Sequence, residues 1–348
     1  YIRRGERNIT ELGLKSCSTQ LLPKNTVLFS SRAPIGYIAI AENELCTNQG
    51  FKSVIPNENT DPLFLYYLLK YNKNKIESMG SGTTFKEISG NTMKNIVVSV
   101  PRDKKVQEQI SSMLGVIDNK IESNEKINNN LEQQAEALFH SLFVEDVNPI
   151  WKEGVLSDLG TIVAGGTPSK TKPEYYSKKG IAWITPKDLS LNKSKFISHG
   201  EVDISELGFS KSSTIKMPTG TVLFSSRAPI GYIAIAANEV TTNQGFKSVV
   251  PNENVGTAFM YYLLKFLLPT IEGMASGSTF KEISGAGMKS IPVVIPDNKT
   301  IDKFNAFCTP IFQQQEVLEA ENSRLVDIRD VLLPKLMAGD LDVSSIEL

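Results

Sequence analysis

VLFSSRAPIGYIAIA occupies residues 27–41 of the chain and returns without a change at residues 222–236. The copies are offset by 195 residues, and the alignment extends on both sides without gaps. Downstream, residues 47–54 return as 242–249, and residues 84–90 return as 279–285. A repeat of this length is far longer than a solenoid unit of ~20–50 residues and has the size of a domain plus a connector. The chain therefore consists of two copies of one long unit.

The second copy has an opening segment that the first copy lacks in this sequence. Residues 146–195 belong to the second copy, and about 45 residues that would match them are not found ahead of Tyr1. We therefore expect the N-terminal domain to be incomplete at its start, so that an N-terminal targeting segment cannot be read.

Composition sets limits on the class of protein. Apolar residues make up 41% of the chain and charged residues 22%, as in ordinary globular proteins. No apolar run approaches the ~18 residues of a membrane span. The three widely spaced cysteines argue against a disulfide framework or a zinc knuckle, so a reducing cytoplasm is the expected location. The two histidines, His140 and His199, are too few and too far apart for a metal site or a catalytic triad.

The net charge of −1 counts weakly against nucleic-acid binding, but the charge is uneven. The window from Lys170 to Lys195 holds seven lysines and two acidic residues, a net charge of +5, with Tyr175, Tyr176 and Trp183 among them. Lysines with interleaved aromatic residues suit a surface that follows phosphates. A solvated lysine-rich loop is the alternative interpretation.

The first ~100 residues of each copy read as strands and turns. In the second copy we expect a buried strand at 222–224, a turn at 225–229 and a second strand at 231–236. The turn carries Arg227, and the matching turn carries Arg32, each beside two serines. An arginine on a rigid tip can contact phosphates or base edges, and a surface ion pair is the alternative.

Two further polar clusters recur in both copies. Asn243 and Gln244, like Asn48 and Gln49, can pair with adenine, although capping a turn is their commoner role. The loop at 276–281 resembles a phosphate-cradling loop but lacks the spacing of a nucleotide-binding P-loop. A structural role for this loop is favoured over a DNA-backbone contact. Between these clusters, residues 258–268 have helical spacing, with Tyr261 and Tyr262 expected in the core.

The rest of each copy has the apolar spacing of a long helix. The apolar positions step by three, four or seven in a heptad-like seam, and they include Ile110, Ile117, Ile121, Ile127, Leu131, Ala135, Leu138, Phe304, Phe307, Ile311, Leu318, Leu325, Ile328, Leu332 and Leu336. Two such stripes in one chain predict an intramolecular coiled coil. Thr309 and Pro310 read as an N-cap followed by proline at the first helical position, which predicts a helix from there to about Met337.

At this level of detail the chain resembles the specificity subunit of a type I restriction–modification system. The similarity rests on the domain–helix–domain–helix order, on Gly-Gly-Thr-Pro-Ser at 165–169, on Trp-Ile-Thr at 183–185 and on the Gly-Ser-Thr-Phe-Lys loop. A proline-led segment before each helix (Pro101, Pro296) and the helix entry at 106–110 also match, and the second copy departs from the family at that entry.

The resemblance implies an α+β fold with two target-recognition domains separated by two long helices that pair as an antiparallel coiled coil. The domains are expected at 1–103 and 146–298, and the helical spacers at 104–145 and 299–348. The resemblance also implies a non-catalytic subunit that reads one half of a bipartite target on double-stranded DNA with each domain. Two methyltransferase subunits and the restriction subunits are the implied protein partners. S-adenosylmethionine, ATP and magnesium would belong to those partners, with no cofactor, metal or membrane contact in this chain.

The candidate DNA-contacting residues combine the repeated clusters with the basic window. They are Arg32, Asn48, Gln49, Lys52, Ser81, Thr83, Lys86, Thr167, Ser169, Lys170, Lys172, Tyr175, Lys187, Arg227, Asn243, Gln244, Lys247, Ser276, Ser278 and Lys281. Because these clusters are nearly the same in both copies, we expect two similar half-sites arranged as an inverted repeat. Differences such as Arg3-Arg4 against Ser198-His199 would break that symmetry.

Two other functions stay open at this stage. A specificity module of a type IIB-like restriction enzyme has the same architecture with different partners. A duplicated coiled-coil scaffold for proteins is less favoured, and it predicts no steep dependence of DNA affinity on salt.

Overall fold

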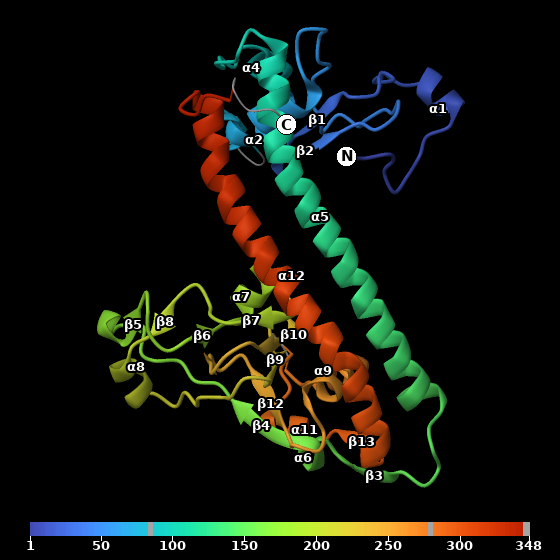
Figure 1. Ribbon diagram of the computed structural model, residues 1–348, viewed down its shortest axis with the longest axis vertical. Helices are drawn as coiled ribbons and strands as arrows, with labels where there is room; N and C mark the ends of the chain where they lie inside the picture. The colour runs from blue at the N-terminus through green and yellow to red at the C-terminus, as the bar shows by residue number, and fades with distance from the viewer. Residues whose placement is uncertain (83–85, 278–280, 344–348) are drawn as a thin grey trace. The chain divides into compact units, whose positions relative to one another are not determined.

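The computed structural model describes residues 1–82, 86–277 and 281–343 (Figure 1). Contacts divide it into unit 1, Tyr1–Ser123 with Asn322–Leu348, and unit 2, Asn124–Glu321. The boundary falls inside the long helices, because each half of a helix packs within a different unit. The bounds predicted from the sequence place the helices in separate spacers, at 104–145 and 299–348.

Unit 1 is built around a two-stranded hairpin and a set of helices. Its elements before the long helices are α1 (Glu11–Lys15), β1 (Val27–Ser31), β2 (Ile35–Ile40), α2 (Pro62–Tyr71), α3 (Lys73–Ser78) and α4 (Gly90–Lys94). Strands β1 and β2 are antiparallel, with Val27 opposite Ile40. The core joins the hairpin to α2 and to both long helices, and includes Val27, Phe29, Phe64, Leu68, Leu114 and Leu336.

Unit 2 contains a five-stranded sheet in the order β4-β12-β9-β10-β7. Its strands and helices are β3 (Lys152–Val155), α6 (Leu156–Leu159), β4 (Gly160–Ala164), η2 (Pro173–Tyr175), β5 (Tyr176–Ser177), β6 (Trp183–Ile184), α7 (Pro186–Leu191), β7 (Phe196–Ile197), β8 (Asp203–Ile204), α8 (Glu206–Ser210), β9 (Val222–Ser226), β10 (Ile230–Ala236), β11 (Thr241–Thr242), β12 (Lys247–Pro251), α9 (Thr257–Phe266), α10 (Leu268–Met274), α11 (Gly285–Lys289) and β13 (Pro292–Ile295). The expected strand pair and the expected helix at 258–268 are present. The turn between β9 and β10 is shorter than predicted, and a second short helix follows α9.

The repeated 15 residues fold in the same way in both units. Ser30 Oγ donates to the carbonyl of Pro34 at 2.8 Å and accepts from the Tyr37 N–H at 2.7 Å. Ser225 makes the same two bonds, at 2.9 and 2.8 Å. Each tip also contains a cis Ala–Pro peptide bond. The hairpin tip is therefore held by the strand's own serine.

The two long helices are α5 (Lys104–His140), continued by η1 (Ser141–Glu145), and α12 (Asn298–Ala338). At 1.5 Å per residue, they are about 56 and 62 Å long. The predicted start of the second helix at Thr309–Pro310 is wrong, because α12 begins at Asn298 and runs through Pro310. Phe304 and Cys308, on the turns before Pro310, are fully buried. We attribute the continuity to this burial, which offsets the hydrogen bond that Pro310 cannot donate.

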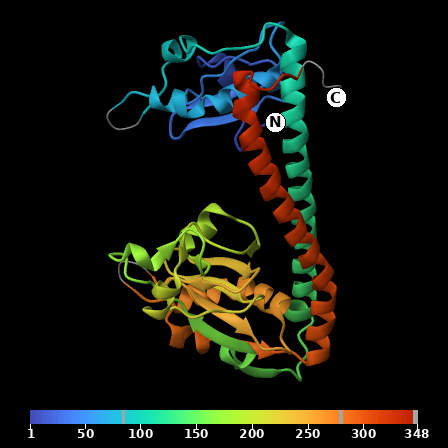
Figure 2. The same ribbon diagram turned by 60° about the vertical axis from the view of Figure 1, so that its left-hand side comes forward.

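The helices pair within each unit, and they lie side by side in both views (Figures 1 and 2). Ile127, Phe307 and Ile328, predicted for the seam, are instead 44, 41 and 49% exposed. Asn124 and Gln315 are buried in the helix interface. Polar residues in such a seam fix the register of the pair.

The amide nitrogens of these two side chains donate hydrogen bonds across the seam. Asn124 Nδ2 donates to Glu321 at 2.7 Å, and Gln315 Nε2 donates to the Asn128 carbonyl at 3.2 Å. The expected fold class, mixed α/β recognition domains with antiparallel paired helices, is confirmed by the observed architecture. Among the described residues, no helix is long and apolar enough to cross a membrane.

Candidate nucleic-acid interface

An arginine at each hairpin tip shares a carboxylate with a lysine. In unit 1, Glu87 lies 3.8 Å from Arg32 Nη1 and 3.3 Å from Lys52 Nζ. In unit 2, Glu282 lies 3.5 Å from Arg227 and 3.4 Å from Lys247. The same cluster of two cations and one carboxylate therefore occurs twice.

The loop that carries the glutamate is fixed to the hairpin by its backbone. The Ile88 N–H donates to the Ser31 carbonyl at 2.9 Å, and Ile283 makes the equivalent bond to Ser226 at 3.1 Å. Glu87 is also paired with Ser81 through two backbone bonds of 3.1 and 2.9 Å. The glutamates thus orient Arg32 and Arg227, whose side chains remain 38% exposed to solvent.

Glu87 and Glu282 are not among the residues predicted from the sequence to contact DNA. Both lie in the repeated Thr-Phe-Lys-Glu-Ile-Ser-Gly stretch, in which the neighbouring Lys86 and Lys281 are the predicted DNA-contacting residues. Repetition could have identified these glutamates, because Glu87 recurs as Glu282 at the same offset of 195 residues that relates the two arginines and the two lysines of the clusters. Lys247 is buried in this cluster, whereas Lys52 is partly exposed, so Lys247 serves the cluster more than the surface.

The Asn-Gln pairs divide into a structural and an exposed residue. Asn48 Oδ1 accepts the Gly50 N–H at 2.9 Å, and Asn243 Oδ1 accepts the Gly245 N–H at 2.8 Å. Both asparagines therefore cap their turns. Gln49 and Gln244 are exposed beside them, and Gln244 accepts from the Thr167 hydroxyl.

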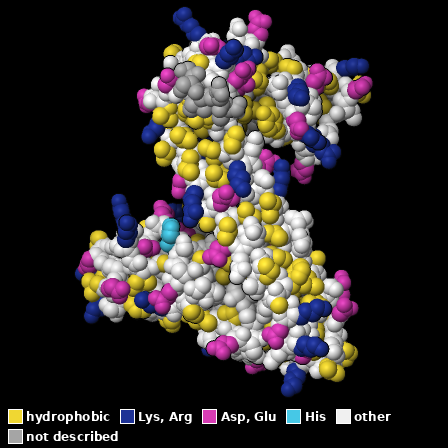
Figure 3. Space-filling model, viewed as in Figure 1, with side chains coloured by type: hydrophobic (Ala, Val, Ile, Leu, Met, Phe, Trp, Pro, Cys, Tyr) yellow, Lys and Arg dark blue, Asp and Glu magenta, His cyan; other side chains and the backbone are white. Residues whose placement is uncertain are grey.

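The lysine-rich window does not form one basic surface. Lys195 is buried, Lys187 pairs with Glu201 at 2.6 Å, and Lys172 lies 3.9 Å from Glu174. On the face shown in Figure 3, Lys and Arg side chains on each unit stand among Asp and Glu side chains. The net charge read from this window therefore overstates its exposed positive charge.

The other candidates lie on the exposed part of the same window and on the repeated loops at 81–86 and 276–281. Lys170 is exposed, Ser169 is exposed and bonded to Thr171 at 2.9 Å, and Tyr175 is half-buried. The exposed loop candidates are Ser81, Lys86, Ser276 and Lys281. Thr83 and Ser278 lie outside the described residues.

A buried ionic cluster joins Lys195 and α9 of unit 2 to both long helices. The Lys195 ammonium donates to Glu132 of α5, to Gln315 of α12 at 2.7 Å and to the Tyr262 hydroxyl at 3.2 Å. Its Nζ also lies 4.3 Å from the centre of the Phe312 ring. Lys265 donates to the second oxygen of Glu132 at 2.7 Å.

The charges of this cluster shift its titration. Burial acts to raise the pKa of Glu132, but the ammonium groups of Lys195 and Lys265 outweigh it and lower that pKa from 4.5 to about 2. Burial lowers the pKa of Lys195, and the Glu132 carboxylate opposes this effect. Glu132 therefore stays ionised at neutral pH and connects α5 to Lys195, the residue before β7, and to Lys265 of α9.

Unit 1 has a related cluster with different residues. The Tyr67 hydroxyl donates to Asp118 of α5 at 2.8 Å, and Arg329 of α12 pairs with the same carboxylate at 2.9 Å. Lys70 lies 3.8 Å from it. In each unit, a carboxylate of α5 thus connects a tyrosine, Tyr67 of α2 or Tyr262 of α9, to a cation.

Among residues 1–82, 86–277 and 281–343, no group of three or more His, Cys, Asp or Glu side chains is arranged to hold a metal ion. Cys308 is buried, which raises its pKa to about 12. The arrangement of side chains is suited to contacting a ligand with exposed arginine, glutamine and lysine groups.

Comparison with known proteins identifies relatives along nearly the full chain. A family model described as the type I restriction modification DNA specificity domain matches residues 1–133 and 149–319. The chain is 32% identical, over 371 residues, to the type I restriction enzyme MjaIX specificity subunit of Methanocaldococcus jannaschii, and the alignment covers 99% of this chain and 84% of that protein.

More distant relatives agree. The HindI specificity subunit of Haemophilus influenzae is 25% identical over 405 residues, which cover 92% of this chain and 87% of that protein. The crystal structure of the type I restriction–modification S subunit from M. genitalium superposes with a TM-score of 0.63 at 21% identity, covering 91% of this chain and 84% of that chain. That structure shares the fold.

Proposed function

The chain belongs to the type I restriction modification DNA specificity family, and we propose from this that it is the DNA-reading subunit of a restriction–modification complex. Its contribution is sequence specificity, while catalysis resides in other subunits. Both recognition domains of the family's pattern are represented, since the matched residues fall in two blocks. A protein of this function works in the cytoplasm, where the DNA is.

The target is a bipartite sequence with two similar half-sites. The observation that carries this proposal is the repeated tip geometry, in which Arg32 with Glu87 in unit 1 matches Arg227 with Glu282 in unit 2. An arginine oriented in this way suits a guanine edge or a phosphate. Because the helices pair antiparallel, similar half-sites are expected as an inverted repeat.

The protein partners are two methyltransferase subunits and the restriction subunits. S-adenosylmethionine, ATP and magnesium are the cofactors of those partners and of their reactions. The long helices α5 and α12 carry exposed apolar side chains, among them Val116 at 61% and Val317 at 63% exposure, which suit docking of other subunits.

The test is to co-express the chain with the methyltransferase subunit of its own system and to map N6-methyladenine over the host genome. A gapped motif with two similar, inverted halves is the expected result. Unrelated halves would contradict the half-site proposal and leave the DNA-reading role intact. No new methylation from a stable complex would contradict the DNA-reading role.

Matched variants connect the motif to the tips. Arg227→Ala is expected to relax base preference or lower methylation through one half-site, and Arg32→Ala through the other. Their effects should fall on different halves of the same motif. Binding to a DNA duplex should also weaken linearly in log affinity against log salt. A salt-independent interaction would favour a type of protein scaffold instead.

A further inference from the structure

Each hairpin tip places a hydrogen-bond donor beside an acceptor. Arg227 Nη1 lies 3.5 Å from Glu282 Oε2, and Arg32 Nη1 lies 3.8 Å from Glu87 Oε2. The four side chains are 36–39% exposed. Both separations exceed the length of a hydrogen bond, so the two groups attract each other and keep their hydrogen-bonding capacity.

The remaining contacts of these side chains fix the carboxylate and leave the guanidinium free. Glu87 Oε1 accepts from Lys52 Nζ at 3.3 Å, and Glu282 Oε1 accepts from Lys247 Nζ at 3.4 Å. Within residues 1–82, 86–277 and 281–343, neither arginine donates a hydrogen bond and neither Oε2 accepts one. Solvent-exposed ion pairs contribute little to folding stability. A role in binding therefore explains the repeated pair better than a role in stability.

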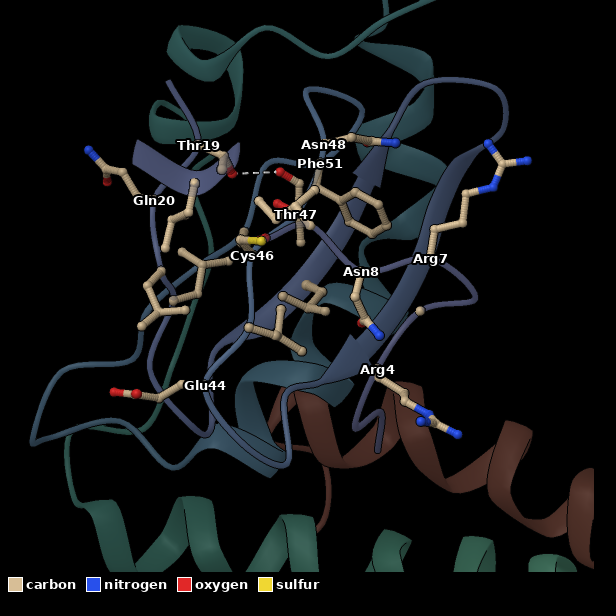
Figure 4. A pocket seen from close by; sticks show the side chains of 18 of the residues that line it. Arg4, Arg7, Asn8, Thr19, Gln20, Glu44, Cys46, Thr47, Asn48 and Phe51 are labelled. Atoms are coloured by element: carbon tan, nitrogen blue, oxygen red, sulfur yellow. Dashed lines mark hydrogen bonds between the residues drawn. The ribbon is translucent and has the colours of Figure 1, made fainter. Parts of the chain in front are cut away.

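The pair lies on the outer surface of unit 1. The pocket drawn in Figure 4 is lined by Asn48 and Gln49 of the neighbouring turn, and its lining in the described part of the chain does not include Arg32 or Glu87. In unit 2, Glu282 likewise remains 36% exposed. A ligand as large as a DNA duplex can therefore contact both groups.

The surroundings of the arginine favour a base edge over a phosphate. A phosphate would bring a second anion beside the glutamate, whereas a base edge is uncharged. Each arginine lies in a three-residue connection, 32–34 or 227–229, between two antiparallel strands. The major groove of B-DNA admits a two-stranded β-ribbon, and bidentate arginine contacts to O6 and N7 of guanine are the commonest specific contacts there. An arginine on such a tip is therefore suited to a guanine.

The glutamate beside the arginine matches the next base along a strand. Successive bases are about 3.4 Å apart along a strand, close to the 3.5 and 3.8 Å between guanidinium and carboxylate. A carboxylate only accepts hydrogen bonds. It therefore contacts the amino group of cytosine or adenine and repels the keto oxygen of thymine or guanine.

We propose that each arginine–glutamate pair reads two neighbouring base pairs in the major groove, with the arginine on a guanine and the glutamate on the amino group of an adjacent cytosine or adenine. The inference rests on the DNA-reading function proposed above and adds Glu87 and Glu282 as specificity-determining residues. Because both units carry the pair, both halves of the target should contain this dinucleotide.

The test maps N6-methyladenine with the methyltransferase complex of the full chain and of single variants. Wild type should give a motif with a guanine next to cytosine or adenine in each half. Glu282→Gln should keep the guanine and admit thymine or guanine at its neighbour in one half, because an amide can accept from an amino group or donate to a keto oxygen. Glu87→Gln should do the same in the other half.

A matched control separates reading from charge. Glu239 pairs with Lys216 at 3.1 Å and lies beyond the end of β10 that is remote from the tip. Glu239→Gln thus removes one negative charge from unit 2 without touching the tip, and its motif should equal that of wild type. A motif relaxed by Glu239→Gln as much as by Glu282→Gln would overturn the proposal.

Binding to duplexes that carry the mapped motif measures the same effect. With the amino base replaced by a keto base, wild type should bind about five- to 150-fold more weakly, the cost of one wrong base pair. For Glu282→Gln this ratio should shrink to less than about threefold, since the amide accepts or donates. A general loss of affinity leaves the ratio unchanged.

The possible failures can be told apart. No motif from wild type would contradict the DNA-reading function itself. A wild-type motif without the dinucleotide would overturn this inference alone, and so would equal amino-to-keto ratios in wild type and both variants. A uniform loss of methylation with unchanged ratios would mean that the glutamates only hold the arginines, which also overturns it. If Glu282→Gln forms no stable complex, Glu87→Gln decides, because its partner Lys52 is partly exposed.

Discussion

Replacing Glu132 with glutamine should destabilise unit 2 through a loss that depends on pH. The substitution keeps the shape of the side chain and removes the charge that Lys195 and Lys265 share. The Lys195 side chain is 6% exposed and would remain buried as a cation with a neutral amide, Gln315 and aromatic rings. Leaving one partner of a buried pair uncompensated costs about 3–5 kcal/mol.

The titration of Glu132 gives a similar magnitude. A pKa lowered from 4.5 to about 2 corresponds to about 3 kcal/mol of stability at pH 7. Because the folded pKa is the lower one, this stability is present above about pH 4.5 and is lost as the pH falls towards 2. The difference between wild type and Glu132→Gln should therefore be full at pH 7 and less than half as large at pH 3.

Tryptophan emission during urea unfolding is the assay. Both tryptophans of the chain, Trp151 and Trp183, lie in unit 2, so their emission reports on that unit. With a slope of about 3 kcal/mol per molar urea, the midpoint should fall by about 1 M at pH 7. Asp118→Asn removes the matching carboxylate of unit 1 and serves as the control, since it should leave the tryptophan transition in place.

Two outcomes would refute this reasoning. A loss below 1 kcal/mol at pH 7 would show that Gln315 and the rings solvate Lys195 without Glu132. A loss of the full size that is equal at pH 3 and pH 7 would show that packing, and not charge, accounts for the effect.

Three other changes test the packing of the helices and hairpins. Pro310→Ala should raise the stability of unit 2 by about 2 kcal/mol in the same urea assay, since it restores a helical N–H; a lower midpoint would contradict the observed path of α12. Asn305→Ala should lower it by about 1–3 kcal/mol, because Asn305 bonds the Phe259 N–H and the Val255 carbonyl at 3.1 and 2.9 Å, whereas Gln107→Ala in unit 1 should not change tryptophan emission. Gly231→Ala should open the unit 2 hairpin to hydrogen exchange more than Gly36→Ala opens that of unit 1; a methyl at Gly231 would lie 2.5 Å from the packed Leu268 side chain, and at Gly36 it would meet the flexible Lys73. Equal exchange in the two hairpins would contradict that difference.

The repeated hairpin and the tyrosine helix could be predicted because their signals are local. The buried strand that begins at Val222 is followed directly by turn residues and a second strand. The helical spacing around Tyr261 and Tyr262 indicates a buried face. The resemblance to a family, read from the order of domains and motifs, gave the function class that the comparisons support.

The helix limits could not be predicted from local signals. Thr309 and Pro310 have the residue types of a helix start, but Thr309 Oγ1 donates to the Asn305 carbonyl within the same helix. Ile127 fits the seam by spacing alone, and yet Asn124 is the residue that pairs across it with Glu321. The deciding interactions connect residues almost 200 positions apart.

The candidate site divides in the same way. Spacing and repetition identified Arg32, Arg227 and the exposed Gln49 and Gln244 as accessible polar groups. Net charge over a window could not show that Lys195 is buried against Glu132, because the partner stands 63 residues away in the sequence.

By itself, the sequence determined the duplication, the order of domains and helices, and the local form of the hairpins. These features depend on neighbouring residues and on the identity between the two copies of the repeat. Only the tertiary structure decided which charges are exposed and where the long helices begin. The physical reason is burial: a charge or a hydrogen-bonding group is stabilised by whichever partner the fold brings to it, and that partner is set by packing between distant segments.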